Sequence, residues 1–167
     1  MTSVDTQIVS VVISIISLGV AMFSVRLAMQ YRQETERLSA GNIFSSHLIN
    51  INKYLVDHPE LWMVYDDHPL NKTTQLTPLI RARIDGYLHM VFNLFSTTYG
   101  FYVQGIGEQR MRDDDREYWD AYKNYGMVLM KNSSRARDLF KDSTTQGLYP
   151  KSFVDFMNGL IRKVEEG

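Results

Sequence analysis

The sequence contains no cysteine, which excludes disulfides, thiol nucleophiles and thiolate metal sites. It also lacks an excess of either charge, because 18 Lys and Arg residues stand against 19 Asp and Glu residues and leave a net charge of -1. A protein that binds the phosphate backbone of nucleic acid normally presents a clustered basic surface. No nucleic-acid partner is therefore expected. The sequence also has no glycine-rich phosphate loop, serine-nucleophile motif or kinase motif.

Apolar and aromatic side chains are plentiful. Hydrophobic residues make up 44% of the sequence and aromatic residues 12%, which is too apolar for a disordered chain and enough to fill a core. These residues recur at the helical spacing of three and four rather than in strand alternation. The sequence therefore predicts an all-α fold.

An uncharged, apolar run extends from Thr6 to Val25. At about 1.5 Å per residue, a helix of this length spans roughly 30 Å, the thickness of a bilayer core. The alternative to a membrane anchor is a cleaved signal peptide. The residues before the run include no Lys or Arg, and the run is longer than a typical signal-peptide core, so an uncleaved transmembrane anchor is favoured over a signal peptide. Basic residues follow the run at Arg26, Arg32 and Arg37. The positive-inside rule then predicts a single-pass protein of the inner cell membrane, with its N-terminus outside and its C-terminal domain in the cytoplasm.

Small residues recur along one face of this predicted anchor, at alternating steps of four and three: Ser10, Ser14, Ser17, Ala21 and Ser24. Small side chains let two membrane helices approach closely, and serine hydroxyls form hydrogen bonds across the contact. The stripe predicts that the anchor self-associates; the alternative is that lipid simply tolerates small residues there. We expect the helix to continue past the membrane and to end at Ala40 and Gly41. This divides the chain into an anchor with its juxtamembrane helix, residues 1–40, and a cytoplasmic helical domain, residues 41–167.

Helical periodicity predicts five further helices, over residues 42–56, 78–104, 114–130, 134–141 and 150–164. Pro59 separates the helix predicted over 42–56 from a short helical turn over 60–65, because the residue before a proline disfavours the α conformation. The longest helix starts with Thr77 as a hydroxyl cap and Pro78 at the first helical position. Together these segments predict an irregular antiparallel helical bundle.

The densest group of metal-ligating or catalytic residue types falls around two prolines: His58, Glu60, Asp66, Asp67 and His68. Imidazole and carboxylate ligands together bind zinc or manganese, so this group is a candidate metal site or catalytic site. Its spacing matches no known metal motif. The alternative, which we favour, is that Asp57 and Asp67 cap turns and that each histidine simply precedes a proline.

A second candidate is a polar stripe on the longest predicted helix, formed at a regular spacing of four by Arg81, Asp85, His89 and Asn93. If this stripe lies inside the bundle, it lines a polar cleft in which His89 transfers protons. If it lies outside, it is a solvated face with a favourable ion pair. The stripe is opposite the apolar face of the helix, and this favours the solvated interpretation.

Several short stretches carry a family resemblance: His58 to Asp67, Arg81-Ala82-Arg83 at the start of the long helix, Trp119, and Leu148-Tyr149-Pro150. On these landmarks the chain resembles an uncharacterised bacterial family of short proteins with one N-terminal transmembrane helix and a helical cytoplasmic domain. The resemblance implies the same layout for this chain. The family has no established activity, so the resemblance implies no catalytic residue and no cofactor.

The combination of an anchor, a helical core and no coherent catalytic motif predicts a membrane-anchored interaction or scaffold protein. Its expected partners are membrane lipid, a second copy of itself through the anchor, and another protein; no cofactor is expected. One alternative is a metal-dependent hydrolase that uses the residues from His58 to His68. The other is a small accessory subunit of a membrane transporter or sensor complex. A non-enzymatic role is favoured over an enzymatic one.

Overall fold

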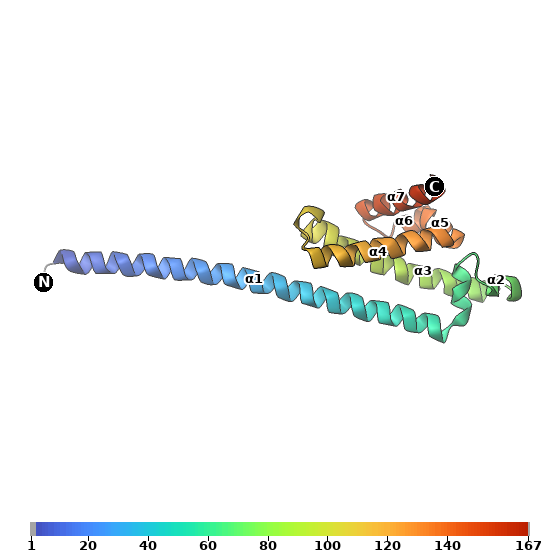
Figure 1. The fold of residues 1–167 in the computed structure, drawn as a ribbon, viewed down its shortest axis with the longest axis horizontal. Helices are drawn as coiled ribbons and strands as arrows, with labels where there is room; N and C mark the ends of the chain where they lie inside the picture. The colour runs from blue at the N-terminus through green and yellow to red at the C-terminus, as the bar shows by residue number, and fades with distance from the viewer. Residues whose placement is uncertain (1–2, 167) are drawn as a thin grey trace. The chain divides into compact units, whose positions relative to one another are not determined.

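The computed structural model describes the backbone of residues 3–166 and the side chains of residues 18–32, 34–35 and 44–166. Within this part of the chain the ordered elements are all helices and no strand occurs, as expected for an all-α protein (Figure 1). The chain divides into two compact units, Met1–Ile43 and Phe44–Gly167. The second unit is called the helical domain below.

The first helix, α1, extends from Ser3 to Asp57. The predicted helix end at Ala40 and Gly41 is therefore wrong, and the separate helix expected over 42–56 is the C-terminal part of α1. A glycine inside a helix costs only about 1 kcal/mol relative to alanine. Burial of Phe44 and Ile51 beyond it, at about 2 kcal/mol for each side chain, more than offsets that cost.

Most of the predicted anchor lies outside the residues whose side chains the structure describes. The side chains of residues 6–17 are outside the described set, and these residues include Ser10, Ser14 and Ser17 of the small-residue stripe. The side chains of Ala21 and Ser24 are described and exposed. In the described part of the chain, no helical stretch combines the length and the apolar character that a bilayer crossing requires.

After α1 the chain turns through a short 3-10 helix, η1, over Pro59–Val64, and a one-turn helix, α2, over Leu70–Thr73. His58 leaves the α conformation, with φ −131° and ψ 77°, because the ring of the following proline crowds it. The helical turn expected after Pro59 is thus confirmed, and it buries Leu61 and Val64 completely. The helix α2 lies between the helical turn expected over 60–65 and the helix expected over 78–104, where no helix was predicted.

The central helix, α3, covers Pro78–Tyr99. It begins as predicted, because the Thr77 hydroxyl accepts a hydrogen bond from the backbone N–H of Ile80 at 3.2 Å. Its apolar face is buried among the other helices of the domain: Ile84, Tyr87, Leu88, Val91, Phe92, Leu94 and Phe95. The α conformation ends earlier than expected, and a π-helix, η2, continues over Gly100–Ile106 up to Gly107, which has a φ of +82°.

The rest of the helical domain packs onto α3. A 3-10 turn, η3 (Glu108–Arg110), leads into α4 (Asp113–Asn132), α5 (Ser134–Lys141), α6 (Ser143–Gln146) and α7 (Lys151–Glu166). Helix α4 contacts both α3 and α7. The helices are close at Gly126, since a Cβ atom added there would come into van der Waals contact with the Phe95 ring at 3.4 Å and the Leu160 side chain at 3.5 Å.

Three tyrosine hydroxyls lie near one another inside this bundle, those of Tyr65, Tyr87 and Tyr125. Burial, with a smaller effect of the Tyr125 phenol, raises the pKa of Tyr87 well above its ordinary value. Tyr87 is completely buried, and no group in the described part of the chain forms a hydrogen bond of ordinary geometry with its hydroxyl. An unsatisfied buried hydroxyl of this kind destabilises the folded state.

Candidate functional site

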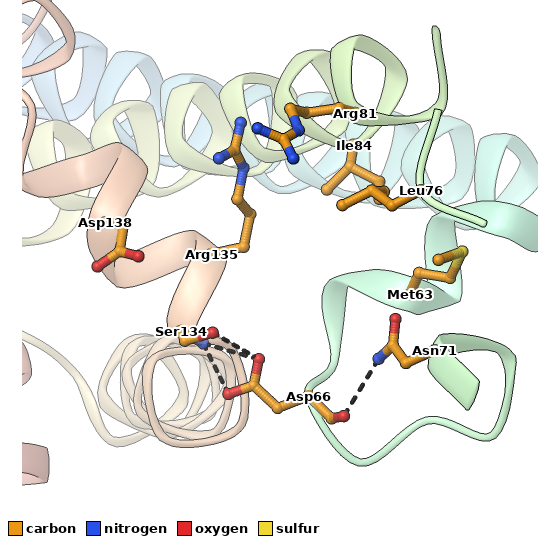
Figure 2. A pocket seen from close by; sticks show the side chains of 9 residues that line it. All are labelled: Met63, Asp66, Asn71, Leu76, Arg81, Ile84, Ser134, Arg135 and Asp138. Atoms are coloured by element: carbon orange, nitrogen blue, oxygen red, sulfur yellow. Dashed lines mark hydrogen bonds between the residues drawn. The ribbon is translucent and has the colours of Figure 1, made fainter. Parts of the chain in front are cut away.

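One surface groove of the helical domain combines charged groups with an apolar floor, and we call it the Arg81 groove. It lies between the η1–α2 segment, the start of α3 and the start of α5, and has a volume of about 420 Å³ (Figure 2). Met63, Leu76 and Ile84 form its apolar surface, and its polar surface comes from Asp66, Asn71, Arg81, Ser134, Arg135 and Asp138.

One wall of the groove is a connection between Asp66 and the start of α5. The Asp66 carboxylate accepts hydrogen bonds from the Ser134 backbone N–H and from its hydroxyl, both at 2.8 Å. The backbone N–H of Asp66 also donates to the carbonyl of Asn132 at 2.9 Å. A carboxylate in this position satisfies the N–H of Ser134 at the positive end of the helix dipole, while the Ser133 hydroxyl accepts from the N–H of Ala136 at 3.0 Å. Asp66 therefore serves as a cap supplied from a distant part of the chain.

Asn71 holds the segment around Asp66 in place. Its side-chain amide nitrogen donates to the carbonyls of Tyr65 at 2.7 Å and of Asp66 at 3.1 Å. The amide oxygen points toward Met63, on the groove side (Figure 2). Because the nitrogen is already used, Asn71 offers the groove a hydrogen-bond acceptor.

A bidentate ion pair fixes Arg135 beside the groove. Its Nε donates to Asp85 Oδ1 at 2.8 Å, and its Nη2 donates to Asp85 Oδ2 at 2.5 Å. The hydrogen bonds to Asp85 are the main reason that the pKa of Arg135 is raised. A fork of this geometry restricts the orientation of the guanidinium, so Arg135 is held in one position relative to α3.

Arg81 lies next to this pair on the groove side of α3. Its side chain is exposed, and it has no ion-pair partner among the described residues. In Figure 2 the side chains of Arg81 and Arg135 point toward each other across the groove. The carboxylate of Asp138 lies apart from Arg81, on the α5 side. The groove therefore has an uncompensated positive charge on the α3 side and a negative charge on the α5 side.

The polar stripe predicted on α3 serves several purposes. Arg81 lines the groove and Asp85 binds Arg135 of α5, so these two residues are not part of a purely solvated face. Asn93 lines a different hollow of about 300 Å³, together with His47 of α1. His89 does not line the Arg81 groove; it is partly buried and lies edge-on to the Phe92 ring, with centroids 6.4 Å apart.

The five residues proposed as a metal site are all described: His58 and Glu60 lie together, whereas Asp66 and His68 contact other groups. No group of three or more His, Asp or Glu residues that could hold a metal ion occurs in the described part of the chain. Glu60 Oε1 accepts a hydrogen bond from Arg83 at 2.6 Å, and His58 Nδ1 is 3.7 Å from the same oxygen. A backbone hydrogen bond, and then the Arg83 guanidinium, hold the pKa of Glu60 below its ordinary value.

Two other members of this group, Asp66 and His68, form hydrogen bonds with nearby backbone groups. Asp66 caps α5, and His68 Nδ1 accepts a hydrogen bond from the backbone N–H of Leu70 at 3.3 Å. The His68 ring also stacks on Trp62, with centroids 6.0 Å apart. Asp67 is exposed. The cap is thus made by Asp66, whereas the alternative explanation of the cluster assigns the caps to Asp57 and Asp67.

Sequence analysis did not identify the partners of these residues. Arg83, Ser134 and Arg135 are separated from Glu60, Asp66 and Asp85 by 23, 68 and 50 positions. Only the complementary residue types were visible in the sequence, and such types recur throughout the chain.

The groove is suited to recognition. The guanidinium groups of Arg81 and Arg135 can bind a carboxylate, the Asn71 oxygen can accept an N–H, and the apolar floor can contact an aliphatic side chain. Comparison of the chain with family models, with curated proteins and with solved structures finds no match.

Proposed function

We propose that this chain is a membrane-anchored interaction protein, in which the N-terminal helix holds the helical domain at the cytoplasmic face of the inner membrane. The observation that supports it best is the exposure of large apolar side chains on α1 between residues 18 and 31. Leu18 is 63% exposed, and Met22 and Phe23 are each 67% exposed.

These exposed residues surround the helix. Phe23 and Val20 project to different sides of α1 from Met22 and Met29, because successive residues of an α-helix are rotated by about 100°. A helix that is apolar on all sides requires apolar surroundings, such as a bilayer. Residues 6–17 extend the same apolar composition toward the N-terminus. Lipid is thus the surrounding that this composition favours.

The proposal assigns recognition to the helical domain, because the Arg81 groove offers charged and apolar contacts side by side. It also includes self-association of the anchor through Ser10, Ser14, Ser17, Ala21 and Ser24. A role as an accessory subunit of a transporter or sensor complex differs from this proposal only in the identity of the partner. No contact among the described residues favours the metal-dependent hydrolase.

Membrane fractionation of the intact chain tests the anchor. The protein is expected in the membrane pellet after washing with high salt and alkaline carbonate, and in solution only after detergent is added. Replacing Val20 and Phe23 together with arginine should move it to the supernatant, since each charge opposes insertion by about 2.5–3.5 kcal/mol. Ser45→Arg, an exposed position outside the run, is the matched control. Recovery of the unmodified chain in the supernatant would contradict the proposal.

Orientation and pairing can be tested with introduced cysteines, since the chain has none of its own. Lys131→Cys, on the exposed surface of α4, should react with a membrane-impermeant reagent only after the cells are opened. Ser17→Cys and Ser24→Cys should crosslink to a second copy in the membrane, whereas Phe23→Cys should not. Labelling of Lys131→Cys in intact cells would contradict the proposed orientation and place the helical domain outside the cytoplasm. Equal crosslinking at all three anchor positions would contradict pairing through one specific face of the anchor.

A further inference from the structure

The Arg81 groove is lined by two arginines and two aspartates, so its charges balance in number but are separated in space, with Arg81 on the α3 side and Asp138 on the α5 side (Figure 2). The carboxylate of Asp85 is engaged by Arg135, and that of Asp66 is engaged by Ser134. Arg81 has no such partner in the described part of the chain, and it is exposed. The α3 side of the groove therefore attracts an anionic group.

The donors available there match a carboxylate. A guanidinium has five N–H donors, and Asp85 uses the Nε and Nη2 groups of Arg135, which leaves Nη1 available. The Arg81 fork faces the same space (Figure 2). Two guanidinium groups that converge on one space form charge-assisted hydrogen bonds with a planar carboxylate more readily than with a neutral amide.

The apolar floor adjoins these donors. Ile84 and Met63 present the edges of buried side chains, and Leu76 is 43% exposed. An aliphatic side chain next to the carboxylate would remove this apolar surface from water, which is favourable in proportion to the area buried. The groove is thus suited to an acidic residue with an apolar neighbour.

The openness of the groove favours a polypeptide over a small molecule. Sites for small ligands usually enclose most of the ligand surface, but here Asp66, Asn71, Arg81 and Asp138 on the rim are all exposed. A segment of another protein can place one or two side chains in such a groove while the rest of it continues outside. The free acceptor oxygen of Asn71 is available for a backbone N–H of that segment.

We propose that the Arg81 groove binds an acidic, apolar segment of a partner protein, with a Glu or Asp side chain against Arg81 and an aliphatic neighbour against Leu76. This rests on the proposed function, because it specifies the chemistry of the interaction partner. Asp138 restricts the position of acidic residues in the bound segment, since a second acidic residue on the α5 side would meet a like charge.

Peptide binding to the intact chain in lipid nanodiscs tests the inference. The probe is a dye-labelled peptide with the core acetyl-Leu-Glu-Leu-amide, and the matched neutral peptide carries Gln in place of Glu. Fluorescence anisotropy should show tighter binding of the acidic peptide by about tenfold, as expected for a charge-assisted contact. Isocaproate, a free aliphatic carboxylate, is added as a competitor to represent a small-molecule ligand.

Variants of the groove locate the binding. Arg81→Gln should weaken binding of the acidic peptide by about tenfold and leave the Gln peptide unaffected. Arg162→Gln is the matched control, because Arg162 is an exposed arginine of α7 that does not line the groove. Leu76→Ala should weaken binding of both peptides by roughly threefold through lost apolar contact. Arg81→Glu should reverse the preference, so that a Leu-Lys-Leu peptide binds better than the acidic one.

Several results would overturn the inference: equal affinity for the Glu and Gln peptides, unchanged binding by both Arg81→Gln and Leu76→Ala, or isocaproate that binds as tightly as the peptide. The test is separate from that of the anchor. If the chain pellets with membranes but Arg81→Gln has no effect, the groove assignment alone fails. If Arg81-dependent binding persists in a chain recovered without membranes, the anchor alone fails.

Discussion

Asp66 caps helix α5 from 68 positions away, with its carboxylate accepting hydrogen bonds from both the backbone N–H and the hydroxyl of Ser134. This contact joins the segment after η1 to the start of α5 and forms one wall of the Arg81 groove. The shape of the groove therefore depends on a polar contact between distant parts of the chain, in addition to helix packing.

Loss of this cap should destabilise the helical domain. Asp66→Ala is expected to lower the free energy of unfolding by about 1–2 kcal/mol, because the N–H and the hydroxyl of Ser134 lose their acceptor, while Ser133 still caps the N–H of Ala136. The neighbouring Asp67→Ala provides the control, since Asp67 is exposed and such substitutions usually change stability by less than about 0.5 kcal/mol. Denaturant unfolding followed by circular dichroism measures both. Equal effects of the two substitutions would contradict the capping role.

The ion pair between Glu60 and Arg83 should make stability depend on pH in the acid range. A backbone hydrogen bond and Arg83 lower the pKa of Glu60 in the folded state, so the contribution of this carboxylate is present above its unfolded pKa of about 4.3. It is lost as the pH falls from there through the lower folded pKa. The difference in unfolding free energy between the unmodified chain and Glu60→Gln should therefore be largest near neutral pH and shrink below about pH 4.3. A difference that is constant with pH would exclude this linkage.

Removing the buried hydroxyl of Tyr87 should not destabilise the protein. Its oxygen has no hydrogen-bond partner of ordinary geometry among the described groups, so Tyr87→Phe should raise the free energy of unfolding by up to about 1 kcal/mol. The adjacent Leu88, which is equally buried, gives the contrast: Leu88→Ala should lower it by about 2–5 kcal/mol. Thermal unfolding compares the two variants. A large loss of stability in Tyr87→Phe would reveal a hydrogen bond that this hydroxyl makes in solution.

The close approach of α4 to α3 and α7 at Gly126 sets a limit on side-chain size. Gly126→Ala should increase the free energy of unfolding by up to about 1 kcal/mol, because helix propensity improves and the added Cβ meets its neighbours at distances of 3.4 to 3.5 Å. Gly126→Leu should decrease it by about 1–3 kcal/mol through overpacking against Phe95 and Leu160. Exposed Ala121 on the same helix supplies the control, since Ala121→Leu should change stability by less than about 0.5 kcal/mol. Similar effects of leucine at both positions would contradict the packing described here.

Local signals in the sequence predicted many helix boundaries correctly. Pro59 ends the α conformation at His58, and Thr77 caps α3, because both effects act between residues that are close along the chain. The helix expected over 134–141 has the same bounds in the structure, Ser134–Lys141. The helix end expected at Gly41 was wrong, because a glycine is only a weak helix breaker and Phe44 is buried beyond it.

The candidate site was less accessible to sequence analysis. Arg81 and Asp85 were recognised as members of a polar stripe, but the spacing alone favoured a solvated face. In the structure Asp85 forms an ion pair with Arg135, so it is not simply solvated. The residues next to Asp85 and Arg135 in the sequence do not indicate this pairing. The group from His58 to His68 was conspicuous in sequence, yet in the folded chain Glu60 and Asp66 have partners from α3 and α5.

The sequence by itself determined the helical class of this protein, the bounds of α5, those of α4 and α7 to within two residues, and the position of its apolar N-terminal run, because these follow from periodicity and from contacts within a few residues. Only the tertiary structure decided which charges are neutralised and which remain available. That outcome depends on three-dimensional distances between residues such as Asp66 and Ser134, and residue order specifies those distances only through the packing of the complete helical domain.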